Sequence, residues 1–183
     1  MTGLTATQAD ILENALENNS LFQTYLPCPE DLEGEEKFNW FYDNWGTKWM
    51  DTIDVKREGN NISAATTTAW APPLAAIANI ASKFYPEALF EVAYSEAGMD
   101  FMGVAMVKGD TFTKAEGSHA RTLFYEFLCD EGRMEEALLW DEGDISDALE
   151  DEFYEKEADL MDAKWEECVS KCKAQMAKKA VVA

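Results

Sequence analysis

The sequence predicts an α+β fold with an acidic helical extension at its C-terminal end. Short strand-like segments separated by turn residues occupy the middle of the chain, and helical periodicity dominates both ends. Apolar residues make up 47% of the 183 positions, enough to fill a core. We therefore expect an α+β core over residues 1–117, with a helical N-terminus, and an acidic helical extension over residues 118–183 that packs on the core or projects from it.

The first 46 residues predict two short helices joined by an extended connector. Thr7 can cap a helix from about Gln8 to Asn18. The prolines of Leu26-Pro27-Cys28-Pro29 exclude a helix there. A second helix should follow from Glu35 to Asn44 and end at Gly46. We expect that helix to bury three aromatic residues, Phe38, Phe41 and Trp45.

The middle of the chain predicts strands around one helix. Apolar Trp49, Ile53 and Val55 alternate with polar residues, and Gly59-Asn60-Asn61 indicates a hairpin turn before a strand from Ile62 to Trp70. Pro72 and Pro73 suit the first turn of a helix that continues to about Tyr85. Three further strands are expected at Leu89 to Tyr94, Asp100 to Lys108 and, briefly, Thr111 to Lys114. The strand from Asp100 is apolar on both faces, as in the centre of a sheet.

Helical periodicity returns after Gly117. Ser118 can cap one helix, and a second, short helix carries Met134, Leu138 and Leu139. A long final helix should begin near Ser146. Its apolar stripe has spacings mostly of three and four, through Leu149, Phe153, Leu160 or Met161, Trp165, Cys168, Cys172 and Met176.

Several short motifs follow one another in a recognisable order. They are Leu26-Pro27-Cys28-Pro29-Glu30-Asp31-Leu32, Asn44-Trp45-Gly46-Thr47-Lys48-Trp49, Thr68-Ala69-Trp70-Ala71-Pro72-Pro73, Tyr85-Pro86, and Tyr94-Ser95-Glu96-Ala97-Gly98 with Phe101 and Gly103. Over roughly residues 26–110 the chain thus resembles the YubB-type ferredoxin-like domain family of phage and plasmid proteins. The resemblance implies a ferredoxin-like antiparallel sheet with packed helices. It implies no catalytic residues and no cofactor.

Charge is the main sequence evidence on function. The net charge is −21, from 36 acidic and 15 basic residues, so we expect neither direct nucleic-acid binding nor membrane binding. Residues 130–167 hold 17 acidic residues against Arg133, Lys156 and Lys164. If this segment were one helix of about 57 Å, it would carry one net charge per about 4 Å, close to the phosphate spacing of a DNA strand.

The leading hypothesis is a non-enzymatic phage or plasmid accessory protein that binds a basic host protein in the bacterial cytoplasm. Defence or nucleic-acid-handling machinery, bound by nucleic-acid mimicry, is the expected target. The expected contact residues are Glu135, Glu136, Asp141, Asp144, Asp147, Glu150, Asp151, Glu152 and Glu155. An acidic helix face that only keeps the protein soluble is the alternative explanation of the charge.

Two other functions stay open. The chain could be a structural module that forms a homodimer through its C-terminal helix. It could also be a small-ligand or nucleotide-binding domain, in which Trp45 and Trp49 stack on the ligand and Lys48 contacts a phosphate, with Trp70 nearby. For the tryptophans, we favour packing beneath the Pro72-Pro73 helix over ligand binding.

The remaining reactive residues favour neither catalysis nor metal binding. His119 is the only histidine and is expected at the surface. The segment Asp141 to Asp147 places Glu152 at position twelve of a calcium loop, but Gly143 and Ile145 leave positions three and five without side-chain ligands. The four cysteines form no CxxC pair and are expected to be free. We predict no metal, no membrane span and no secretory signal.

Overall fold

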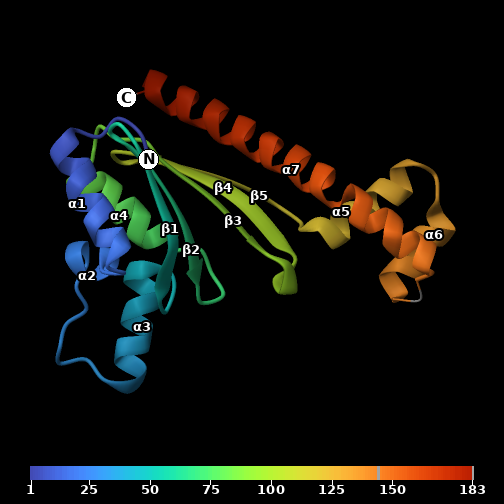
Figure 1. Ribbon diagram of the computed structural model, residues 1–183, viewed down its shortest axis with the longest axis horizontal. Coiled ribbons are helices and arrows are strands. Elements are labelled where there is room, and N and C mark those ends of the chain that lie inside the picture. Colours follow the sequence, from blue (N-terminus) through green and yellow to red (C-terminus); the bar gives the residue numbers. More distant parts are fainter. Residues whose placement is uncertain (144, 183) are drawn as a thin grey trace. The chain divides into compact units, whose positions relative to one another are not determined.

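The computed structural model describes residues 1–143 and 145–182 and confirms an α+β fold (Figure 1). It forms two compact units. The first contains Met1–Val92 and Ala105–Thr113, and the second contains Ala93–Val104 and the chain from Lys114 onward. The borders between the units fall within three strands. The domain border expected from the sequence, at residue 117, stays a prediction.

Three helices open the first unit: α1 (Ala6–Glu17), α2 (Leu21–Tyr25) and α3 (Gly34–Trp45). The capping residue of α1 is Thr5 rather than the expected Thr7. Thr5 Oγ1 accepts from the backbone N–H of Gln8 at 3.3 Å, while Gln8 Oε1 accepts from the N–H of Thr5 at 2.9 Å. The five-residue α2 was not expected, because so short an apolar segment carries no periodic signal.

Two aromatic residues of α3, Trp45 and Phe38, differ in exposure. Trp45 is buried, stacks on Phe41 at 4.4 Å between ring centroids and donates its indole N–H to the carbonyl of Leu26 at 3.0 Å. Phe38 is exposed and contacts Tyr42, so its expected burial was wrong. Phe38 lies on nearly the same face as Trp45 but two turns closer to the start of α3, where residues 33–39 are all exposed.

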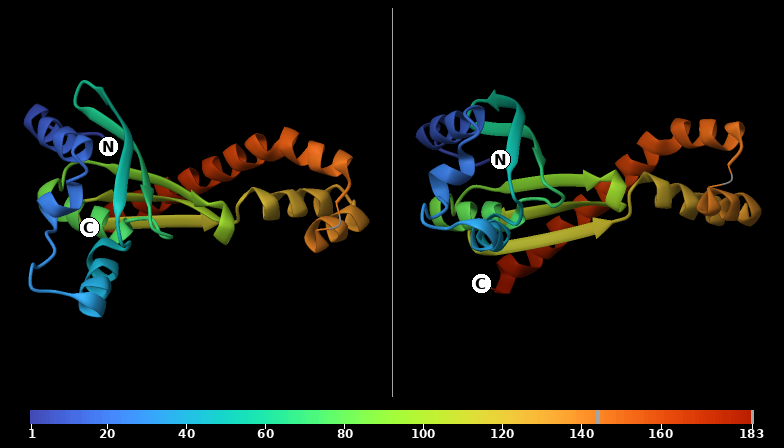
Figure 2. Two further views of the ribbon diagram at one scale, coloured as in Figure 1. Left: turned by 60° about the horizontal axis from the view of Figure 1, so that its bottom comes forward. Right: turned by 90° about the horizontal axis from the view of Figure 1, so that it is seen from below.

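Strands β1 (Met50–Glu58) and β2 (Asn61–Thr68) form an antiparallel hairpin beside α1, visible in Figures 1 and 2. The register shifts between Thr52 and Asp54, so Ile53 lies in a β-bulge. Val55 packs against the core, but Ile53 is 68% exposed, so the expected shared face was wrong at Ile53.

Helix α4 (Leu74–Phe84) supplies much of the first core. Pro73 occupies the N-cap rather than the first turn. The buried residues of this helix share one face at helical spacing, in Ala76, Ile77, Ile80 and Ala81.

Strands β3 (Phe90–Glu96), β4 (Phe101–Lys108) and β5 (Thr111–Gly117) form a second sheet in that order. The short helix η1 (Ala97–Met99) joins the first two, and a turn at Gly109 joins the last two, so neighbouring strands run antiparallel. Residues 102–107 of β4 are all buried, which confirms the central strand expected from its two apolar faces.

Helices α5 (Ala120–Asp130), α6 (Met134–Glu142) and α7 (Asp147–Val182) belong to the second unit. His119, not Ser118, is the N-cap of α5, and its side chain makes no capping hydrogen bond. Asp100 accepts from the His119 backbone N–H at 3.1 Å and from the Thr122 hydroxyl at 2.7 Å. The start of α7 near Ser146 is confirmed.

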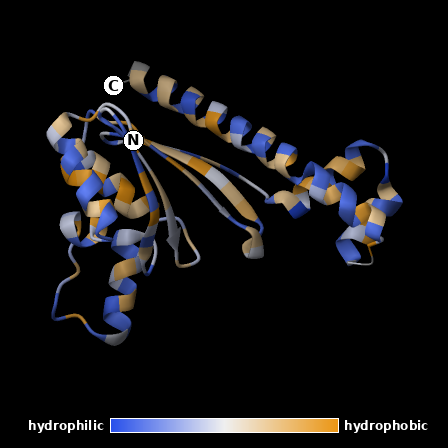
Figure 3. Cartoon of the chain, viewed as in Figure 1, coloured by the Kyte–Doolittle hydropathy of each residue, from blue (hydrophilic) through white to orange (hydrophobic). Residues whose placement is uncertain are grey.

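The apolar stripe of α7 is largely buried within the chain. Hydrophobic and hydrophilic residues alternate along the helix in Figure 3. Leu149, Met161, Cys168 and Cys172 are buried, and Cys172 donates to the carbonyl of Val104. A homodimer through this helix would therefore need another face. No helix within residues 1–143 and 145–182 has the length and hydropathy that crossing a bilayer requires.

Candidate acidic interface

An aromatic cluster holds α5, α6 and the start of α7 together. Trp140 of α6 contacts Phe124 of α5 and Phe153 of α7, each with 4.8 Å between ring centroids. Phe124, Leu128 and Trp140 are buried, so little of this cluster contacts solvent. The helices of the acidic segment therefore pack on this aromatic cluster and do not extend freely into solvent.

Polar contacts also determine which side of α6 faces this cluster. The indole N–H of Trp140 donates to the carbonyl of Arg121 at 3.0 Å, and the Arg121 guanidinium donates back to the carbonyl of Trp140 at 3.2 Å. The same guanidinium lies 4.9 Å from the centre of the Trp140 ring. Because Trp140 finds a hydrogen-bond partner only on the inner side, α6 buries Trp140 and Ala137.

The apolar residues that predicted α6 consequently face outward. Met134 is 52% exposed, Leu138 50% and Leu139 42%. The helix itself was predicted correctly, but its most apolar side chains do not face the core. Ala137 and Trp140 replace them there.

Two glycines break the acidic segment into separate helices. Gly132 and Gly143 both adopt left-handed backbone conformations, with φ of 75° and 79°. The single 57 Å helix considered above is therefore not formed, and the charges lie on α5, α6 and α7. The densest part is the α7 segment 147–167, with ten acidic residues against Lys156 and Lys164.

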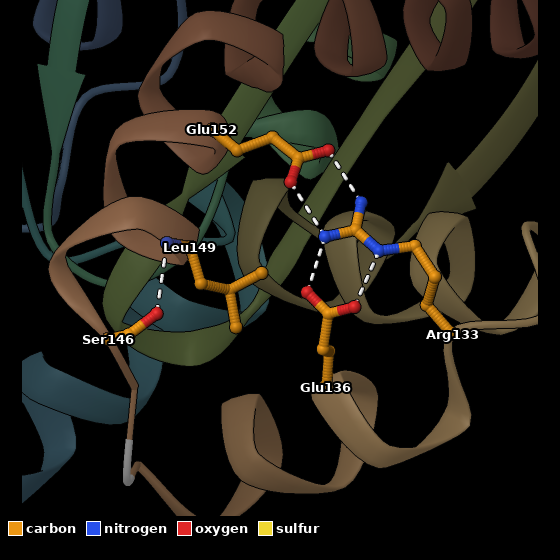
Figure 4. Close-up of polar contacts among 5 residues, drawn as sticks. All are labelled: Arg133, Glu136, Ser146, Leu149 and Glu152. Atoms are coloured by element: carbon orange, nitrogen blue, oxygen red, sulfur yellow. Dashed lines mark hydrogen bonds and ion pairs between the residues drawn. The ribbon is translucent and has the colours of Figure 1, made fainter.

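Arg133 forms an ion-pair network in the acidic segment (Figure 4). Its guanidinium lies between two carboxylates, donating to both oxygens of Glu152 at 2.7 and 2.8 Å and to both oxygens of Glu136. Hydrogen bonds from Arg133 hold the pKa of Glu136 and that of Glu152 below their ordinary values. The two carboxylates raise the pKa of Arg133 in turn.

The two lysines of the segment are also engaged within the chain. Lys156 Nζ lies 4.6 Å from the centre of the Phe127 ring. Lys164 pairs with Glu167 at 2.9 Å, and Lys171 pairs with the same carboxylate. Hydrogen bonds from Lys171 and Lys164 lower the pKa of Glu167 to about 2. All three basic residues of 130–167 therefore have intramolecular partners.

The expected contact residues fall into three groups. Glu136 and Glu152 are partly buried and paired with Arg133. Asp144 lies outside the described residues. The other six are exposed and form no ion pair within the described part of the chain; we call them the acidic interface: Glu135, Asp141, Asp147, Glu150, Asp151 and Glu155.

Part of this charge also stabilises the helices. Glu135 lies in the first turn of α6, and Asp147 and Glu150 lie in the first turn of α7. Carboxylates there interact favourably with the partial positive charge of a helix N-terminus. Ser146 adds a cap, because its hydroxyl oxygen accepts from the backbone N–H of Leu149 at 3.3 Å (Figure 4). Asp141, Asp151 and Glu155 lie outside the first turns, so their exposure has no such explanation.

The Arg133 network makes stability depend on pH in a defined direction. The pKa of Glu136 and that of Glu152 are lowered from about 4.5, so their stabilising contribution is present above pH 4.5 and is lost as pH falls through the lowered values. We expect Arg133→Met to reduce Tm near pH 6 and to show a smaller further loss of Tm between pH 5 and pH 3 than the parent. Lys37→Met, at an exposed position, is the control and should follow the parent. Parallel Tm curves for all three proteins would contradict the role of Arg133.

The tryptophan block just before β1 was considered as an alternative stacking site for a ligand. Trp45 is buried against Phe22 and against Phe41 of its own helix, so it cannot stack on a ligand. Thr47 is fully buried and donates to the carbonyl of Ala69 at 2.9 Å, which ties the block to the end of β2. Trp49 is 43% exposed rather than packed beneath α4.

His119 and Glu152, the other candidate reactive residues, both have contacts within the described part of the chain. His119 is partly exposed, and its backbone N–H donates to the Asp100 carboxylate at 3.1 Å. Glu152, the candidate twelfth ligand of a calcium loop, is already paired with Arg133. Across residues 1–143 and 145–182, no group of three or more His, Cys, Asp or Glu residues could hold a metal ion.

Comparison with known proteins gives one match. No curated protein and no solved structure matches the chain. A family model described as "Ferredoxin-like domain in Api92-like protein" matches residues 44–120, less than half of the chain. The match runs from the end of α3 to the first residue of α5, so it leaves out the whole of the acidic segment 130–167. Residues 44–120 of this chain are therefore similar to the ferredoxin-like domain of Api92-like protein.

Proposed function

We propose that this chain is a non-enzymatic accessory protein that binds a positively charged host protein through the acidic interface. The expected target belongs to bacterial defence or nucleic-acid-handling machinery, and binding competes with nucleic acid for the same basic surface. A YubB-type relationship and a phage or plasmid origin are part of this proposal. They rest on the ordered motifs of residues 26–110 and not on the acidic helices.

One observation carries the proposal. The three basic residues of 130–167 are engaged in contacts within the chain, while the six carboxylates of the acidic interface stay exposed. A segment that served only its own folding would gain by pairing these charges. Unpaired carboxylates on packed helices instead present a fixed negative field to a partner.

The charge spacing fits competition with nucleic acid. The α7 segment 147–167 spans about 32 Å at 1.5 Å per residue. Ten acidic residues and two lysines leave a net charge of −8, or one charge per about 4 Å, against 3.4 Å between phosphates of one DNA strand. Attraction of this kind speeds association and weakens as salt screens it.

The test compares two charge-matched variants. Asp141→Lys, Asp151→Lys and Glu155→Lys together reverse three interface carboxylates outside the first helical turns. The control reverses three exposed carboxylates of the first unit: Glu17→Lys, Glu30→Lys and Asp31→Lys. Both variants change the net charge by the same amount, and circular dichroism checks that both remain folded.

Each protein is immobilised and exposed to bacterial lysate at about 50 mM salt, and the captured basic proteins are quantified by mass spectrometry. We expect the parent and control to capture a nucleic-acid-binding protein that the interface variant retains at least tenfold less. Capture should also fall steeply as salt rises toward physiological strength. Equal losses in both variants would show that net charge alone was responsible and would contradict the proposal.

A further inference from the structure

The outward side of α6 combines apolar residues with acidic ones. Met134 and Leu138 are one turn apart and share a face, and Leu139 lies beside Leu138. All three are exposed, and we call them the α6 outer face. Isolated exposed leucines are common on proteins, but adjacent ones on a single short helix form a patch of the kind used for binding.

These side chains contribute little to folding. Ala137 and Trp140 already pack α6 against the aromatic cluster, and the indole N–H of Trp140 is satisfied there. Turning α6 to bury Leu138 would expose Trp140 and break its hydrogen bond. The orientation is therefore fixed by the inner side, and the α6 outer face remains available to another molecule.

Carboxylates surround the α6 outer face. Glu135, Asp141 and Glu142 are exposed on the same helix, and Glu131 is exposed in the turn before it. Of the two cations that contact α6 or adjoin it here, Arg133 is bound to Glu136 and Glu152, and Arg121 lies on the inner side against Trp140. An apolar centre with a charged rim is the usual anatomy of a protein-binding site, and here the rim has one sign.

We propose that the α6 outer face binds a cationic amphipathic helix of the partner protein. Apolar residues of that helix would contact Met134, Leu138 and Leu139, and its flanking lysines or arginines would pair with Glu135, Asp141 and Glu142. This inference rests on the proposed function and specifies it: charge brings the partner near, and the apolar contact selects a helix with one apolar side.

Charge argues against two other occupants. A second copy of the chain would bring another −21 and place carboxylates against carboxylates. An anionic lipid surface would be repelled for the same reason. A cationic helix is the occupant that satisfies both the apolar residues and their rim.

Three synthetic peptides of about 18 residues serve as probes. The first has leucine at every third or fourth position and lysine at the positions between. In a helix all of its leucines therefore share one side. The second has the same composition in scrambled order, and the third replaces every leucine with serine. Binding is measured by isothermal titration at about 50 mM and 300 mM salt.

We expect the helical leucine–lysine peptide to bind at least tenfold more tightly than either comparator. Leu138→Ala combined with Leu139→Ala should remove most of this difference, because alanine keeps the helix while removing the apolar contact. Ile53→Ala is the matched control, since Ile53 is 68% exposed on β1 and its loss should leave peptide binding unchanged.

The outcomes separate this inference from the proposed function. If all three peptides bound equally and only in low salt, the α6 outer face would have no role, while charge-driven binding would stand. If the double alanine variant and Ile53→Ala lost binding equally, the inference would also be overturned. Failure of every peptide to bind would reject the inference, and the lysate experiment would then decide the proposed function separately.

Discussion

Trp140→Ala is expected to lower the free energy of unfolding by about 3–5 kcal/mol, the usual loss for a buried aromatic residue. Trp140 is 2% exposed and contacts Phe124 and Phe153. The substitution opens a cavity between three helices and leaves the carbonyl of Arg121 without its indole donor. Urea denaturation followed by circular dichroism measures the change. Binding through the α6 outer face should fall with it, because Trp140 sets the orientation of that helix.

Trp70→Ala is the matched control, because Trp70 is 64% exposed and its removal creates no cavity. We expect a change within about 0.5 kcal/mol. If Trp140→Ala does not fold, Trp140→Phe keeps most of the ring volume and removes only the indole donor. A loss for Trp140→Ala no greater than that for Trp70→Ala would contradict the packing described for α6.

Gly103→Val is expected to destabilise the chain by about 3 kcal/mol, at the upper end of overpacking effects. A Cβ at Gly103 would lie 2.7 Å from the carbonyl oxygen of Ala115 and 2.7 Å from the Tyr94 hydroxyl oxygen. The Tyr94 ring is held in place by its hydrogen bond to Glu116 at 2.8 Å, and the backbone of β5 cannot retreat without breaking the sheet. Neither neighbour can easily make room.

The control for this substitution is Ala93→Val on β3, where the side chain is exposed. It introduces the same β-branched side chain into the same sheet and should change stability by about 0.5 kcal/mol or less. Thermal and urea unfolding of both variants measure the difference. Similar stability for the two would show that the sheet can absorb a side chain at Gly103.

The sequence predicted well those features that depend on local patterns. The two apolar faces of β4 marked a central strand, and the stripe spaced by three and four marked α7. Gly46 was expected to end α3 and does so with a φ of 77°. In each case the signal comes from neighbouring residues, so no knowledge of tertiary contacts was needed.

Features that depend on distant contacts were missed. The side of α6 that faces the core follows from the bond between Trp140 and Arg121, 19 residues apart. Arg133 and Glu136 are three residues apart and could have been paired from the sequence, but Glu152 joins them from another helix. The hydrogen bond from the His119 backbone N–H to Asp100 could not be predicted either, because the two residues are 19 positions apart.

The second unit is discontinuous in sequence, and this limits how it can be studied in isolation. A fragment starting at residue 118 would lack residues 93–104, which belong to the same unit. It would lose Met102, a fully buried neighbour of Leu123 and Met161, and the Val104 carbonyl that accepts from Cys172. Such a fragment would expose the inner side of α7 to solvent and self-associate. Dissection by point substitution in the full chain preserves the acidic helices, whereas excision does not.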